Sequence, residues 1–287
     1  MTPEPVSTHG SAGSGVSASV GGRGARRIRR IVTTRRGGVS AAPYDSFNLG
    51  AGVGDSPHAV EANRARLARA AGLPPASVVW MRQVHGTAVT AVGVTTPGVT
   101  VLGVTALGVT AVSGTTAAGR PTADQPETDG IVTATTGLAL GVLVADCVPM
   151  LAGDPVAGVI AAVHAGRRGA AAGIALRMLT VMLESGAGVE EIEVLLGPAI
   201  CGRCYEVPVE MRDEVEAALP GSACRTDRGT PGLDLRAGLA RQLRSVGVAG
   251  VAIDPRCTFT DPELFSHRRA APTGRFAGLI WIPPDAG

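Results

Sequence analysis

The feature that most constrains this chain is a pair of apolar segments at residues 144–169, separated by a turn-forming stretch. Gly, Asp and Pro follow one another at 153–155 between the two segments, and these residue types favour chain reversal. The sequence therefore predicts a β-hairpin centred near Pro155–Val156. In such a hairpin Cys147 and His164 are about equally far from the turn and would lie opposite each other.

Facing side chains of an antiparallel pair have their Cβ atoms about 4.5–5.5 Å apart. A thiol and an imidazole at that separation can bind one metal ion, form a nucleophile–base pair, or be a buried pair with a structural role only. The hairpin by itself leaves these three hypotheses open.

A third candidate ligand is His85, which stands in the segment MRQVHGTAV, where a strand-like run meets His-Gly. Together with Cys147 and His164 it makes two imidazoles and one thiol, all suited to zinc. Three protein ligands and one open position are typical of catalytic rather than structural zinc sites.

Composition limits the class of protein. The chain has 287 residues, 45% of them hydrophobic, which suits one domain with a sizeable core. A net charge of +2 gives no overall field that would attract nucleic acid, so no nucleic-acid partner is expected. No stretch is apolar enough for a membrane span or a signal peptide, so no membrane partner is expected either. Five cysteines without an export signal predict reduced thiols and a cytoplasmic location.

The chain divides into a tail, a domain and an insertion. Residues 1–25 are rich in Gly and Ser and are predicted to be disordered. Residues 26–287 are predicted to form one catalytic domain with a low-complexity insertion at about 93–127, whose glycines recur every five residues. This period fits neither a helix nor a half-buried strand, so the insertion is an extended β-hairpin arm or a mobile loop. Short β-rich runs alternate elsewhere with helices predicted at about 56–72, 168–185, 208–219 and 234–246, which indicates an α+β domain.

Several motifs together resemble the YfiH-like family, also called the polyphenol oxidase or multicopper laccase domain family and later assigned as purine nucleoside phosphorylases. The resemblance extends over about residues 30–283. The motifs occur in the family's order and include RQVHGTAV (82–89), TDGIVT (128–133), ADCVPM (145–150), AAVHAGRRG (161–169) and FSHRR (265–269).

The resemblance implies a compact domain with α/β/β/α layers and mixed β-sheets. It implies a metal site at His85, Cys147 and His164, holding zinc, with copper as the other possible metal. It also implies phosphorolysis of adenosine, inosine and methylthioadenosine, with adenosine deaminase as a further activity, so a nucleoside and phosphate are the expected small-molecule partners. One departure concerns substrate preference: Arg167 stands where the family commonly has Trp.

Five further residues are candidates for this chemistry. Arg35 and Arg168 are expected to bind phosphate, because arginine makes paired hydrogen bonds to it. Asn48 is a candidate for binding a ribose hydroxyl or a base edge. Asp129 is expected either to orient a ligand histidine or to act as an acid or base, and Asp146 is a candidate for the same kinds of role.

Other functions remain open at this stage. Five histidines are too few for a multicopper centre, although a single copper site with Met150 as a weak ligand is chemically possible. Cys147 and His164 could instead serve an amidase or cysteine hydrolase, for example one that edits cell-wall precursors. The chain could also be a metal-carrying scaffold that binds partners through its insertion. The pair Cys201 and Cys204 is expected to lie in a loop near the pocket and is assigned no chemistry.

Overall fold

The computed structural model describes residues 25–93, 100–105, 108–113, 125–248 and 250–284. It has two mixed sheets and a two-stranded ribbon. The smaller sheet has the order β1 (Arg29–Val32), β14 (Phe276–Trp281), β7 (Ala139–Val144) and β2 (Val78–Val79). The larger has the order β13 (Gly250–Ile253), β10 (Glu193–Leu196), β8 (Val148–Asp154), β9 (Val159–Ala165), β6 (Gly130–Thr133), β3 (Val89–Ala91), β4 (Thr100–Thr105) and β5 (Gly108–Ser113). The ribbon joins β11 (Ala223–Arg225) to β12 (Pro231–Leu233).

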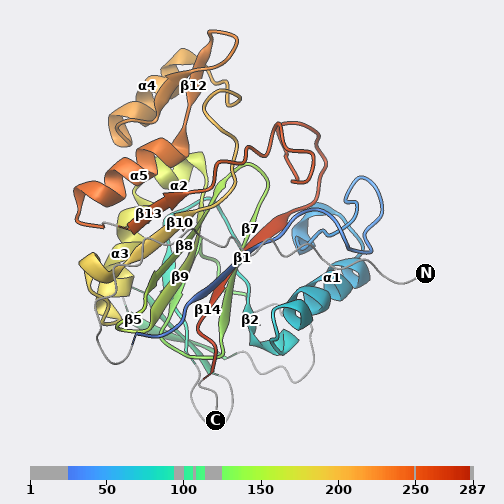
Figure 1. Cartoon of the computed structure of the whole chain (residues 1–287), viewed down its shortest axis with the longest axis vertical. Helices are drawn as coiled ribbons and strands as arrows, with labels where there is room; N and C mark the ends of the chain where they lie inside the picture. The colour runs from blue at the N-terminus through green and yellow to red at the C-terminus, as the bar shows by residue number, and fades with distance from the viewer. Residues whose placement is uncertain (1–24, 94–99, 106–107, 114–124, 249, 285–287) are drawn as a thin grey trace.

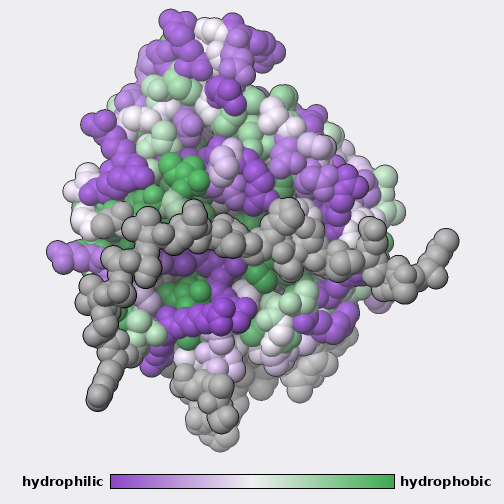
Figure 2. Space-filling model, in the orientation of Figure 1, coloured by the Kyte–Doolittle hydropathy of each residue, from purple (hydrophilic) through white to green (hydrophobic). Residues whose placement is uncertain are grey.

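Helices cover the outer faces of the two sheets (Figure 1). They are α1 (Pro57–Ala70), α2 (Arg167–Ala171), α3 (Ile174–Glu184), α4 (Val209–Ala218) and α5 (Leu235–Ser245), with single 3₁₀ turns at Ala51–Val53, Pro75–Ser77 and Val189–Glu191. Among the described residues, no helix is both long and apolar enough to cross a membrane. Hydrophilic side chains predominate at the end of the molecule that carries α4 (Figure 2).

Three hydrophobic clusters define the layers. Leu67 of α1 packs with Leu279 and Trp281 of β14. Between the sheets, residues of β7 and β14 pack with Leu151 of β8 and Ile160 of β9. A third cluster joins the outer face of the larger sheet to α2, α3 and α5. The order is therefore helix, sheet, sheet, helices, which confirms the α/β/β/α prediction.

Strand periodicity decides which face His164 occupies. Successive side chains of a strand point to opposite faces. In β8 and β9, Met150 and Val163 belong to the cluster under the helices, whereas Leu151 and Ile160 belong to the cluster between the sheets. His164 is four residues after Ile160 in the same strand, so both side chains are on the same face. His164 therefore lies on the face that is directed toward the smaller sheet.

The predicted hairpin at 144–169 exists, but the prediction that Cys147 and His164 lie opposite each other is wrong. His164 pairs with Pro149, and Asp154 pairs with Val159. The turn therefore comes one residue later than predicted, which shifts the register by two. It is held by the Asp154 carboxylate, which accepts hydrogen bonds from two turn amides at 2.8 Å.

Two other elements differ from or add to the sequence predictions. The helix expected at 168–185 is broken into α2 and α3 at Gly173, whose φ of 87° is left-handed and which forms the N-terminal boundary of α3. In the insertion, β4 and β5 pair antiparallel and extend the larger sheet beyond β3. The predicted disordered tail, apart from its last residue, lies outside the described residues.

Candidate metal centre and its cavity

The site forms where the chain crosses from one sheet to the other. Strand β7 belongs to the smaller sheet and β8 to the larger, and the three residues between them include Asp146, with φ 102°, and Cys147. His164 comes from the end of β9, and His85 from the loop before β3, with φ 61°. The potential ligand atoms of His85, Cys147 and His164 lie within 4.8 Å of one another. The two imidazoles meet edge to face, with ring centroids 4.6 Å apart.

A single buried carboxylate positions both histidines. Asp129 is fully buried and accepts a hydrogen bond from Nδ1 of His164 at 2.8 Å. Its oxygens also accept from the backbone N–H groups of Val84, His85 and Gly86 at 3.2, 2.9 and 2.7 Å. With Nδ1 occupied, Nε2 of His164 is the nitrogen left for a ligand role, which is the usual outer-shell arrangement of a metal-binding histidine.

The electrostatics of this group favour a thiolate. Burial alone would raise the pKa of Cys147, but hydrogen bonds and charge from His164 and His85 lower it to about 6. Burial would lower the pKa of His164, yet its bonds to Asp129 and Cys147 raise it to about 9. Burial would likewise raise the pKa of Asp129, and hydrogen bonds from His164 and Gly86 hold it below its usual value. In the metal-free chain the group is therefore a thiolate–imidazolium–carboxylate series.

The residues present fit a soft or borderline metal ion. One thiolate and two imidazoles are zinc ligands and also suit copper, and a carboxylate on the far nitrogen of His164 raises its basicity. The backbone leaves room for this packing only because residue 166 is glycine. A Cβ there would lie 2.9 Å from Cδ2 of His85 and 3.2 Å from Sγ of Cys147.

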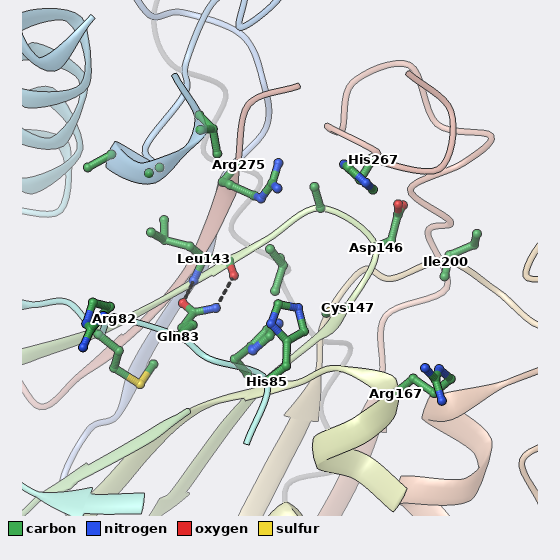
Figure 3. Close-up of a pocket in the computed structure, with 18 of the residues that line it drawn as sticks. Arg82, Gln83, His85, Leu143, Asp146, Cys147, Arg167, Ile200, His267 and Arg275 are labelled. Atoms are coloured by element: carbon green, nitrogen blue, oxygen red, sulfur yellow. Dashed lines mark hydrogen bonds between the residues drawn. The ribbon is translucent and has the colours of Figure 1, made fainter. Parts of the chain in front are cut away.

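The centre opens into a cavity of about 800 Å³. His85 and Cys147 lie at its middle, with Arg275, His267 and Arg167 around them (Figure 3). The volume falls in the range of small-molecule sites, about 300–1,000 Å³.

Asp146 lines the cavity and also supports its wall. Its carboxylate accepts hydrogen bonds from the hydroxyls of Thr258 and Ser266 and from the N–H of Arg268, each at 2.6 Å. Its carbonyl accepts from Ile200 N–H at 3.0 Å. Asp146 therefore fixes the segment that carries His267 against the candidate metal centre.

Of the two arginines expected to bind phosphate, neither lines the cavity. Arg35 bonds to the side chain of Asp45 at 3.0 Å and lies over the ring of Phe265. Arg168 is exposed on the first turn of α2, while its neighbour Arg167 lines the cavity. A helix directs consecutive side chains about 100° apart, so only one of the two can face the centre.

Five arginines line the cavity, and sequence analysis assigned a role to none of them: Arg64, Arg82, Arg167, Arg268 and Arg275. Arg82 pairs with Glu127, whereas none of the other four forms an ion pair with a carboxylate within the described ranges. Arg64 lies over the ring of Trp80, and burial lowers its pKa to about 10. These guanidinium groups are available to an anion in the cavity.

Asn48 and Gln83 hold loops at the edge of the site. Asn48 is buried and bonds to Asp55, to Gly50 and to the N–H of Arg275, so it fixes two segments of the cavity wall and does not itself line the cavity. Gln83, which sequence analysis did not single out, lines the cavity and exchanges two hydrogen bonds with the backbone of Leu143 at 2.8 and 2.9 Å (Figure 3).

Met150 does not approach the centre. It packs under the helices with Val148 and Ala152, on the face of the sheet opposite to that of His164. The hypothesis of an axial Met150 ligand is therefore wrong, since alternate residues of a strand face opposite ways.

The fold and the site define a layered α+β protein with a thiol–imidazole centre in an arginine-lined cavity, where His164 is buried and His85 is exposed. The model of the family described as multi-copper polyphenol oxidoreductase laccase matches residues 29–283. The chain belongs to this family, which confirms the resemblance.

Relatives and solved structures agree with that placement. A Mycobacterium tuberculosis protein named purine nucleoside phosphorylase is 57% identical over 256 residues, covering 89% of this chain and 92% of the relative. A Corynebacterium glutamicum protein of the same name is 49% identical, covering 91% and 97%. The crystal structure of YlmD from Geobacillus stearothermophilus is 32% identical, with a TM-score of 0.76 and coverage of 90% and 92%.

Proposed function

We propose that this chain is a metal-dependent purine nucleoside phosphorylase, with adenosine, inosine and methylthioadenosine as substrates. The observation that carries the proposal is the group of His85, Cys147 and His164 in a cavity with four arginines that have no carboxylate partner among the described residues. The names of the Mycobacterium and Corynebacterium relatives support the same reaction. The chain would act in the cytoplasm, where nucleosides and phosphate are both present.

Phosphorolysis joins a phosphate oxygen to C1′ of the ribose while the bond from C1′ to the purine nitrogen breaks. Arg167 and Arg275 are the candidates for holding the phosphate, because both line the cavity with no carboxylate partner among the described residues. This assignment replaces Arg35 and Arg168. Arg167 would add a cation where the family commonly has Trp.

The metal site consists of His85, Cys147 and His164, with zinc as the proposed ion and copper as the other candidate. When bound, the ion would supply a Lewis acid beside the reacting oxygens. Asp129 keeps both histidines in position and keeps Nδ1 of His164 protonated. It therefore acts as a positioning residue.

The departing purine needs a proton, and His267 is the candidate donor. It lines the cavity, and its neighbours Ser266 and Arg268 both bond to the Asp146 carboxylate. Three short hydrogen bonds tie the Asp146 carboxylate to Thr258, Ser266 and Arg268, so we assign it to positioning the His267 segment. Asn48 would act in the same way on the segment of Arg275.

The test is incubation of the purified chain with adenosine, with and without phosphate, and separation of the products by chromatography. Adenine that appears only with phosphate, and is lost in Cys147→Ala, is the expected result. Inosine from adenosine would reveal the deaminase activity, for which the carboxylate acid–base is unassigned.

The competing function is a cysteine hydrolase, which the lowered pKa of Cys147 favours. It predicts turnover of amide substrates that thiol alkylation abolishes and chelators leave unchanged. A scaffold without enzymatic activity predicts no turnover and binding that depends on the insertion at about 93–127.

A further inference from the structure

A second thiol cluster lies behind the wall of the cavity. Cys201 and Cys204 come from the loop after β10, and Cys257 follows β13. Their Sγ atoms all lie within 4.8 Å of one another. All three cysteines have free thiols, and the cluster shares no residue with the centre of His85, Cys147 and His164.

The backbone holds these three sulfurs together. A parallel bridge joins Ala199 to Cys257, and the N–H of Cys201 points at Sγ of Cys257 at 3.3 Å. The carbonyl of Cys201 accepts from the N–H groups of Cys204 and Tyr205, both at 2.9 Å, which closes a tight turn. A two-residue spacer folded in this way is the spacing that structural zinc sites use.

We propose that Cys201, Cys204 and Cys257 form a second metal site, which binds a zinc-like soft cation through three thiolates. At a Zn–S distance of about 2.3 Å, tetrahedral ligands have sulfurs about 3.8 Å apart, so modest closure of the present spacing completes the site. Cys204 also lines a separate cavity of about 530 Å³ with Glu206, Arg228 and Phe259. A fourth ligand would therefore approach from that cavity.

The charges that such a site would bring together are complementary. Three thiolates whose sulfurs all lie within 4.8 Å of one another repel each other, and a divalent cation would remove that repulsion.

The second site would stiffen the wall of the first cavity. Ile200 and Tyr205 flank the cysteine turn and line the large cavity. Thr258 follows Cys257 and donates to Asp146 at 2.6 Å. One ion on the three thiolates would therefore tie together two segments that position the catalytic cavity, without touching substrate.

Cobalt binding to the full chain under reducing conditions tests the proposal, because thiolate-to-cobalt absorption grows with the number of thiolates. In a Cys147→Ala background only the second cluster supplies grouped thiolates. In the Cys147→Ala chain we expect one Co²⁺ bound at the thiolate cluster. Its absorption should be about three times that of the single-thiolate centre, which is measured in a Cys204→Ser chain that keeps Cys147. Cys224→Ser is the matched control, because its Sγ bonds to the Gly202 carbonyl and lies outside the cluster.

Three results would overturn the proposal. The first is a Cys147→Ala protein that binds Co²⁺ without thiolate absorption. The second is equal absorption in Cys204→Ser and Cys224→Ser. The third is a Cys201–Cys204 disulfide in freshly isolated protein whose reduced form takes up only one metal ion, which would make the pair a redox dithiol. None of these results depends on nucleoside turnover, so the proposed function is tested separately.

Discussion

At the scale of single residues, the centre depends on one buried carboxylate. Asp129 bonds to the ring of His164 and to the backbone of the loop that carries His85. Sequence analysis identified Asp129 because the resemblance places it near the pocket and it is polar in apolar surroundings. It left open whether Asp129 orients a histidine or acts as an acid or base. The hydrogen bonds support orientation, since every one of them fixes His164 or the loop that carries His85.

Replacing Asp129 with Asn is expected to weaken zinc binding about 10–100-fold. The NH₂ group of Asn would face the backbone N–H groups of Val84 and Gly86, which now donate to a carboxylate oxygen. Donor would then face donor, and these hydrogen bonds would be lost. Competition with a chromophoric chelator measures the affinity. Asp154→Asn is the control, because Asp154 is also buried and also accepts three backbone N–H bonds, far from the centre. Equal zinc affinity in the two variants would contradict the assigned role.

The thiol of Cys147 gives a pH-dependent prediction for the metal-free chain. Its pKa is lowered to about 6, so the reactive thiolate increases as pH rises through 6. Alkylation of Cys147 should slow about tenfold between pH 7 and pH 5. Mass spectrometry of the labelled peptide measures the rate. Burial raises the pKa of Cys224, so its labelling should still be increasing above pH 8; the same profile for both thiols would refute the prediction.

At the scale of elements, two connections of the chain create the site. The step from β7 to β8 carries Asp146 and Cys147 from one sheet to the other, and the step from β9 to α2 brings Gly166 against all three ligands. The turn residues predicted the hairpin of β8 and β9. They could not predict that the apolar run before Cys147 belongs to a different sheet, because β7 is as apolar as β8 and its partner, β14, lies more than a hundred residues away.

Gly166→Ala is the element-scale prediction. The new methyl group would lie 2.9 Å from His85 and 3.2 Å from the Cys147 sulfur, so the ligands must move apart. We expect zinc affinity to fall at least tenfold while the chain stays folded, measured by metal content after dialysis and by circular dichroism. Gly188→Ala is the control: Gly188 also has extended backbone before a short helix, and the nearest atom to its Cβ is 3.7 Å away. Full zinc content in Gly166→Ala would be contrary to this account.

At the scale of the whole molecule, local sequence patterns predicted single helices better than they predicted contacts between distant residues. The boundaries of α4 and α5 were predicted within a residue or two, and Asp234 caps α5 by accepting a hydrogen bond from the N–H of Ala237. The cavity arginines were not found, because which arginine faces the centre depends on the packing of loops distant in sequence. The same holds for Cys257, which is 58 residues from Ala199 in the sequence. A parallel bridge between these two residues brings Cys257 next to Cys201.

The central claim is that this cavity transfers a ribosyl group from a purine to phosphate at a metal centre. The most direct measurement is phosphorus NMR of the zinc-loaded chain with adenosine and phosphate, alongside chromatography of the base. The account predicts one ribose phosphate ester for every adenine released, and neither product in Cys147→Ala. Adenine with free ribose, or inosine without any phosphate ester, would contradict it.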